Sequence, residues 1–325
     1  MLTSGKQSFI GLLCALTLGG ALPAQAADYP TKPIRLIVPF ASGGSVEAFA
    51  RQISVKLSLR LGQPIIIEPK PGAGGAIGTE FVMRAEPDGY TFLLHSGSII
   101  TDPLMRKKPT YDVRKDLTPV IMAATAGLAV ASSNAMPFTS MAGLIDYARQ
   151  NPGKLNYGTP GIGSSVHLLT EMFNSLAGVK IVHVPYKGGG PAMTALMANE
   201  VQVLFTPLVT AKPQALTGRI RPLAVTTGKR SNAWPELPTI NEARVIDYDF
   251  GVWYAFFAPP KTPPALLNQM NREIAAVLQD PEVSAWLTQN GLDPVPNSSE
   301  EFRVMLNREV DRWASMLKTT AISVD

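Results

Sequence analysis

Short apolar runs rich in β-branched residues alternate along the chain with segments whose apolar residues recur at helical spacing. Residues 34–40 form the first run and predict a buried strand. The stripe that follows consists of Val46, Phe49, Ala50, Ile53 and Leu57. This spacing predicts a helix with one buried face, and Gly62 ends it.

The same alternation continues to residue 96. Residues 64–68 and 91–96 predict two more strands, and a helix is predicted between them near residues 76–85. The order is therefore βαβαβ, which normally forms a parallel sheet.

A second copy of the pattern follows about 120 residues later. Residues 154–165 predict a strand and a Gly-rich turn, and a helical stripe then runs to Gly178. Strands are predicted at 180–186 and 201–207, and Pro191 suits the first position of the helix between them. We therefore predict an α/β protein with two similar domains around a cleft.

Two long apolar segments connect the copies. Residues 118–132 and 248–260 predict strands that cross between the domains and form a hinge, and residues 221–231 predict a strand plus loop. These crossings place 27–124 with 249–325 in domain 1 and 125–248 in domain 2.

The C-terminal part predicts helices that pack back on domain 1. Thr262, followed by Pro263, predicts a helix start, and Ser298 with Glu301 fits a capping box for a last helix that ends near Lys318.

The first 26 residues predict a cleavable secretory signal peptide. One Lys precedes an apolar stretch from Phe9 to Leu22, and small residues end at Ala26, after which cleavage is expected. A membrane anchor is disfavoured because the apolar stretch is shorter than the roughly 20 residues that span a bilayer. A lipoprotein attached through Cys14 is disfavoured because the bulky Leu13 precedes it.

Composition narrows the function classes. Of the 325 residues, about 299 remain after cleavage, and the formal charge falls from +4 to +3. The chain has no long run of Lys or Arg, so nucleic acid is not an expected partner. The single Cys leaves with the signal peptide, so no disulfide is expected, and this suits a bacterial periplasm.

Three Gly-rich turns fail as nucleotide sites. In "GAGGAIG" (72–78), Pro69 and Pro71 interrupt the passage from the strand, and no acidic residue follows where a ribose needs one. "GTPGIG" (158–163) has its glycines in the wrong order, and "GGGP" (188–191) lacks the P-loop Lys. We therefore expect no cofactor.

The turns suit a small anion instead. Unpaired N–H groups and a partial positive charge mark a helix N-terminus, and glycines let a ligand approach the backbone. Hydroxyls beside the turns come from Ser42, Ser45, Thr159, Ser164 and Ser165. Matched turns in facing domains favour a carboxylate site, whereas a single such turn would be taken as ordinary loop geometry.

Catalytic and metal motifs are weak. No G-x-S-x-G surrounds any serine, and Ser315 with Lys318 forms S-x-x-K without its companion motifs. His95, His167 and His183 are scattered, which argues against a metal site. A base near a nucleophile is missing, so the chain is not expected to be an enzyme.

Several residues keep two interpretations. Glu47 either caps its helix or reaches a ligand, and Lys187 either steers anions or caps a strand end. Trp253 and Tyr254 either line the cleft or pack in the core.

Seven ordered segments resemble the Bug family. They include "YPTKPIRLIVPFASGG", "LGQPIIIEPKPGAGGAIGT", "LNYGTPGIGSSVHL" and "VHVPYKGGGPAM", and the resemblance covers nearly the whole mature chain. Bug proteins are periplasmic substrate-binding proteins of tripartite tricarboxylate transporters. The resemblance implies a Venus-flytrap (type II periplasmic binding protein-like) fold that captures a small carboxylate without catalysis, with membrane transporter subunits as partners.

The resemblance also implies the ligand-binding residues. In domain 1 they are Phe40, Ser42, Gly43, Gly44, Ser45 and Ser96, with Glu47 at the helix start. In domain 2 they are Thr159, Gly161, Gly163, Ser164, Ser165 and Thr206.

Two departures from the family pattern bear on the ligand. Glu47 and Thr206 stand where many members have Asp. Loss of an acidic group at Thr206 favours a di- or aromatic carboxylate over an amino acid. A secreted hydrolase and a ligand-sensing partner of a signalling receptor remain the alternatives, and a monomer is expected.

Overall fold

A computed structural model describes residues 29–243 and 248–320, together with Met1. The predicted signal peptide, apart from Met1, lies outside the described residues. No helix in the described part is long and apolar enough to cross a membrane.

Ten strands in the described residues form one sheet that serves two lobes, in the order β2-β1-β3-β9-β4-β7-β5-β6, with β8 and β10 also paired to β4. The strands of lobe 1 are β1 (Ile34–Val38), β2 (Ile65–Pro69), β3 (Thr91–Ser96), β9 (Gly251–Ala258) and β10 (Leu292–Pro294). Those of lobe 2 are β5 (Asn156–Thr159), β6 (Val182–Pro185), β7 (Val203–Pro207) and β8 (Arg221–Val225). Within each lobe three strands are parallel, as the βαβαβ pattern predicted.

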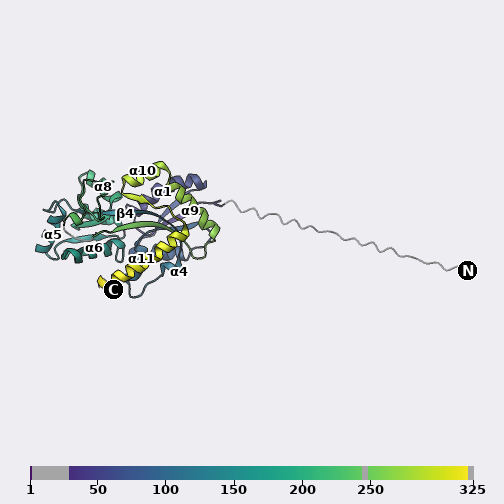
Figure 1. The fold of residues 1–325 in the computed structure, drawn as a ribbon, viewed down its shortest axis with the longest axis horizontal. Helices are drawn as coiled ribbons and strands as arrows, with labels where there is room; N and C mark the ends of the chain where they lie inside the picture. The colour runs from purple at the N-terminus through teal and green to yellow at the C-terminus, as the bar shows by residue number, and fades with distance from the viewer. Residues whose placement is uncertain (2–28, 244–247, 321–325) are drawn as a thin grey trace.

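The strand β4 (Thr118–Ser132) joins the lobes, and its bounds match the predicted crossing strand. Its first part pairs with β9, from Thr118 to Gly127, and its last part pairs with β7 and β8, from Leu128 to Ser132. Figure 1 shows β4 between a lobe that carries α5, α6 and α8 and a lobe that carries α1 and α9. The fold is thus α/β with two lobes around a cleft.

Helices cover both lobes. Those of lobe 1 are α1 (Ser45–Leu61), α2 (Ala76–Met83), α3 (Ser98–Met105), α4 (Val113–Asp116), α9 (Pro264–Leu278), α10 (Pro281–Gln289) and α11 (Ser299–Thr320). Those of lobe 2 are α5 (Met141–Gln150), α6 (Ser165–Ala177), α7 (Gly189–Met197) and α8 (Leu208–Leu216). The helices α9 and α11 contact β4, and they also contact α1 and α3 respectively, so the C-terminal helices pack on lobe 1 as predicted.

The helix α1 shows how the pattern produces the local structure. Its predicted stripe is buried, from Val46 to Leu57, while Val55 and Leu59 on the other face are exposed. Gly62 ends the helix with φ +66°, a left-handed conformation that costs glycine little.

Two predicted helix starts are wrong and one is confirmed. Thr262 is not the cap of α9, because its hydroxyl donates to the carbonyl of Pro259 and the helix begins after Pro263. Pro191 is the third residue of α7, since the glycines before it already adopt the helix. Ser298 and Glu301 form the predicted capping box, in which the Glu301 amide donates to the Ser298 hydroxyl (3.2 Å).

Candidate functional site

A small cavity lies between the lobes, where several strands end and helices begin. Its volume is about 40 Å³, a few times what one buried water requires. Its walls come from both lobes, and those of lobe 1 include the strand β9. The lining residues are Phe40, Ala41, Gly44, Ser45, Val46, Glu47, Ser96, Ser98, Pro160, Ser165, Val166, Gly189, Leu204, Phe205, Thr206, Pro207, Val252 and Tyr254.

The start of α1 provides unpaired hydrogen-bond donors at this cavity. Gly44 is its N-cap, with extended φ and ψ, and no side chain caps the helix. The first helical bond runs from the Ala48 amide to the Gly44 carbonyl (3.0 Å), so the amides of Ser45, Val46 and Glu47 find no acceptor among the described residues. These donors and the helix dipole attract an anion.

Glu47 lines the cavity but directs its carboxylate to its own loop. One oxygen accepts from the Gly43 amide (2.7 Å), and the other accepts from the Arg51 guanidinium (Nε, 3.0 Å). Burial opposes ionisation, but the bonds from Gly43 and Arg51 outweigh it and lower the pKa of Glu47. Glu47 therefore holds the loop before α1 and places its charge near the positive end of the helix, and a ligand contact through it stays a prediction.

The turn before α6 is the lobe-2 counterpart, and its groups are mostly used within the protein. The Ser164 hydroxyl caps α6 by accepting from the His167 amide (3.2 Å), and the Ser165 amide donates to the Ser98 hydroxyl of lobe 1 (3.1 Å). Thr159 bonds through its hydroxyl to Gly161 and to His183. This turn is held rigid and is joined to the opposite lobe.

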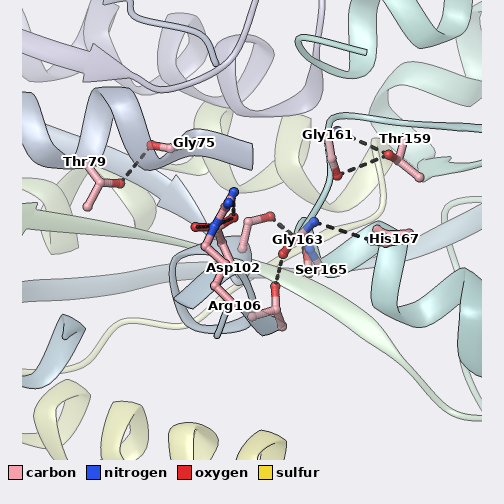
Figure 2. Close-up of polar contacts among 11 residues, drawn as sticks. Gly75, Thr79, Asp102, Arg106, Thr159, Gly161, Gly163, Ser165 and His167 are labelled. Carbon is pink, nitrogen blue, oxygen red and sulfur yellow. Dashed lines mark hydrogen bonds and ion pairs between the residues drawn. The ribbon is translucent and has the colours of Figure 1, made fainter. Parts of the chain in front are cut away.

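Direct contacts between the lobes show that the cleft is closed. The Ala41 amide donates to the Lys187 carbonyl (2.9 Å), and the Thr101 hydroxyl donates to the Gly163 carbonyl (2.8 Å). In Figure 2, Asp102 of α3 and Arg106, the residue after that helix, lie beside Gly163, and Gly161 and Thr159 lie on the other side of that turn.

Glycines make this close approach possible. A Cβ on Gly190 would collide with the Ser42 carbonyl oxygen, and a Cβ on Gly163 would collide with the Asp102 carboxylate. Each glycine lies in lobe 2 and each partner in lobe 1. Any larger side chain at either glycine would therefore hold the lobes apart.

Two stacked histidines support the lobe-2 turn. The rings of His167 and His183 lie 3.9 Å apart, and the Gly163 amide points at Nδ1 of His167 (3.4 Å). Burial lowers the pKa of His167 to about 4; burial and the neighbouring His167 lower the pKa of His183 to about 3. Within the described residues, no three His, Cys, Asp or Glu side chains are arranged to hold a metal ion.

The predicted ligand-binding residues separate into two groups. Those that line the cavity are Phe40, Gly44, Ser45, Glu47, Ser96, Ser165 and Thr206. Those that shape the adjoining loops without lining it are Ser42, Gly43, Thr159, Gly161, Gly163 and Ser164. A role in ligand binding stays a prediction for both groups.

Sequence reasoning left three polar lining positions out of the predicted set. Ser98 lies two residues beyond a predicted strand, and Gly189 belongs to the second Gly-rich turn of its lobe, so position alone was a usable signal. Tyr254 lies within an apolar strand, where only the alternation of faces distinguishes a cleft residue from a core residue.

A model for the "Tripartite tricarboxylate transporter family receptor" (TctC) matches residues 49–322. The chain belongs to this family. Protein BugT of Bordetella pertussis is 34% identical to it over 314 residues, which are 96% of each chain.

Two solved structures extend the similarity of this TctC-family chain to three dimensions. Rpa4515 of R. palustris with adipate superposes with a TM-score of 0.87 at 37% identity and covers 91% of this chain and 99% of its own. MatC of Rhodopseudomonas palustris with bound malate superposes with a TM-score of 0.83 at 28% identity, over 88% and 99% of the two chains.

Family membership settles the broad function. TctC proteins such as the Bug proteins are solute-binding proteins and not enzymes, which excludes the hydrolase alternative. They are periplasmic binding proteins, and this TctC-family protein is therefore a periplasmic solute-binding protein with two lobes around its ligand cleft.

Proposed function

We propose that this protein captures a small carboxylate between its lobes and delivers it to a membrane transporter of the tripartite tricarboxylate type. The observation that carries the proposal is the uncapped start of α1, whose free amides line a closed interlobe cavity. No Lys or Arg is among the lining residues, so backbone donors supply the attraction.

Other helix starts reinforce this polarity. The helix α3 begins at Ser98, α6 at Ser165 and α7 at Gly189. Each of these first residues lines the cavity at the positive end of its helix. The positive end of a helix stabilises a carboxylate and repels an ammonium group. Adipate and malate in the two solved relatives are carboxylates as well.

The cavity provides no free acid for an amine. Glu47 is the one acidic lining residue, and both its oxygens accept bonds from Gly43 and Arg51. Thr206, where the family resemblance implies Asp, is neutral. A dicarboxylate or aromatic carboxylate is therefore a better ligand than an amino acid.

A thermal-shift panel tests the proposal. It would contain adipate, malate, benzoate, glutamate, an alkylamine and a sugar. A ligand at 100 times its dissociation constant should stabilise the fold by about 2.7 kcal/mol. Stabilisation by a carboxylate supports the proposal, and shifts caused only by the sugar or the amine would refute it.

Delivery to the transporter requires export and a partner. We propose that the chain is exported by its signal peptide, cleaved after Ala26 and monomeric. Mass spectrometry of the periplasmic protein would show an N-terminus at Ala27, and light scattering would show one chain per particle. A retained signal sequence would contradict the export proposal.

A further inference from the structure

The hydroxyl of Tyr254 is buried beside the cavity and makes no hydrogen bond of normal geometry with a described residue. Tyr254 lies in β9, its side chain is 0% exposed, and it lines the cavity. Because a buried phenol nearly always finds a partner, an unpaired one in a binding cavity calls for an acceptor from outside the chain.

The backbone and the ring fix where this hydroxyl lies. Tyr254 pairs in register with Ser96 of β3, another cavity residue. The ring stacks on Phe49 of α1, with centroids 5.4 Å apart and planes 14° apart. Burial raises the pKa of Tyr254 above its usual range, with the nearby Ser45 hydroxyl opposing the rise, so the phenol keeps its proton. The donor therefore lies beneath the first turn of α1.

Two other hydroxyls of the cavity, those of Ser96 and Thr206, have already used their protons. Ser96 donates to Ser98 (3.1 Å). Thr210 donates to the Pro207 carbonyl, so the proton between Thr206 and Thr210 (2.7 Å) comes from Thr206. The Tyr254 hydroxyl, in contrast, has the Ser45 hydroxyl beside it but makes no hydrogen bond of normal geometry with any described residue.

We infer that the Tyr254 hydroxyl donates a hydrogen bond to the ligand carboxylate held at the start of α1. The inference rests on the proposed function and adds a ligand-binding residue from the lobe-1 strand β9 to it. A bond between a phenol and a carboxylate is charge-assisted and short, and it strengthens because the cavity excludes water. The expected ligands are therefore molecules that can place an anionic oxygen beneath the first turn of α1.

The test is Tyr254→Phe, measured by calorimetric titration with adipate and with malate. Affinity should fall by roughly tenfold to a hundredfold, as expected for loss of one hydrogen bond to a charged group. The ligand-free variant should unfold at the same or higher urea concentration than the wild type, because an unpaired buried hydroxyl has been removed.

Tyr248→Phe is the matched control. Tyr248 is equally buried, and its hydroxyl donates to the Leu169 carbonyl (2.7 Å). Its variant should lose stability and keep its affinity. Unchanged affinity in Tyr254→Phe, or a stability loss equal to that of Tyr248→Phe, would overturn the inference and leave the proposed function standing. Failure of the wild type to bind any carboxylate of the panel would overturn both.

Discussion

The turns before α1 and α6 look alike in sequence but differ in what they leave unpaired. "SGGS" at 42–45 leaves the first amides of α1 without acceptors. "IGSS" at 162–165 caps α6 through Ser164 and commits the Ser165 amide to Ser98 of the other lobe. Lobe 1 therefore leaves free donors at the cavity, while the lobe-2 turn is committed to contacts within the protein.

The glycines of these similar Gly-rich turns therefore have two different roles. Under the proposed function, a glycine at the cavity wall, such as Gly44, would admit the ligand to the backbone. A glycine at a closing turn admits the other lobe, as at Gly163 and Gly190. The same residue type thus supports binding on one side of the cleft and closure on the other.

The largest expected effect comes from blocking closure. Gly190→Ala places a methyl group against the Ser42 carbonyl only when the lobes meet. Because Gly190 lies in α7, alanine should keep or raise the stability of the ligand-free protein. Carboxylate affinity should nevertheless fall on the order of a hundredfold, about 2.7 kcal/mol by calorimetry.

Gly143→Ala is the control for this substitution. It makes the same change in α5, another helix of lobe 2, but its Cβ would meet Phe138 and Ser140 of the same lobe, away from the cavity. No loss of affinity is expected. Equal losses in the two variants would show that closure at Gly190 does not control binding.

Stability should depend on pH through three histidines that are neutral in the fold. Burial lowers the pKa of His95 to about 4, as for His167, and His183 is lower still. The unfolded values are about 6.5, so the unfolded chain binds more protons as pH falls from 6.5 to 4. Stability is complete above pH 6.5 and declines below it, by up to about 1.4 kcal/mol per pH unit for each histidine.

Urea unfolding between pH 7 and 4.5 measures this slope. His183→Gln should reduce the pH dependence of the unfolding free energy by the contribution of one histidine, whatever the variant's stability at pH 7. A stability that stays constant over this range in the wild type would contradict the neutral, stacked pair in lobe 2.

The two serines of the lobe-2 turn should separate stability from binding. Ser164→Ala removes the α6 cap and should cost about 1 kcal/mol of unfolding free energy with little change in affinity. Ser165→Ala removes a lining hydroxyl and should weaken binding by a few-fold with little change in stability. If Ser164→Ala lowered the affinity instead, the ligand would have to lie deeper in lobe 2, against Ser164.

Glu47→Gln should have the smallest effect on binding. Glutamine still accepts from Gly43 but loses the ion pair with Arg51, so stability should fall by about 0.5–1 kcal/mol. Removal of a negative charge beside a bound carboxylate should leave affinity unchanged or raise it a few-fold. A tenfold loss of affinity would instead show that Glu47 contacts the ligand.

Much of this architecture is predictable from periodicity. The bounds of β3 and β4 match the predicted strands because both are buried runs of apolar residues. The helix α3 escaped prediction because "SIITDPLM" has no polar face and contains a proline. Its role is visible only in the folded protein, where its Thr101 contacts Gly163 of the other lobe.

The site was predictable in outline but not in detail. The family resemblance pointed to both turns, yet it treated them as equivalent. Which amides stay free depends on a partner 67 residues away in sequence, as Ser98 and Ser165 show. Periodicity and motif spacing carry no information on such interlobe contacts, nor on whether Tyr254 finds an acceptor.

A crystal structure with the best-binding carboxylate of the panel tests the central claim most directly. The account predicts a closed cleft in which a carboxylate oxygen lies within about 3.2 Å of the Ser45 or Val46 amide nitrogen. A carboxylate bound to the Thr159–Gly163 turn, with the α1 amides facing only water, would contradict it.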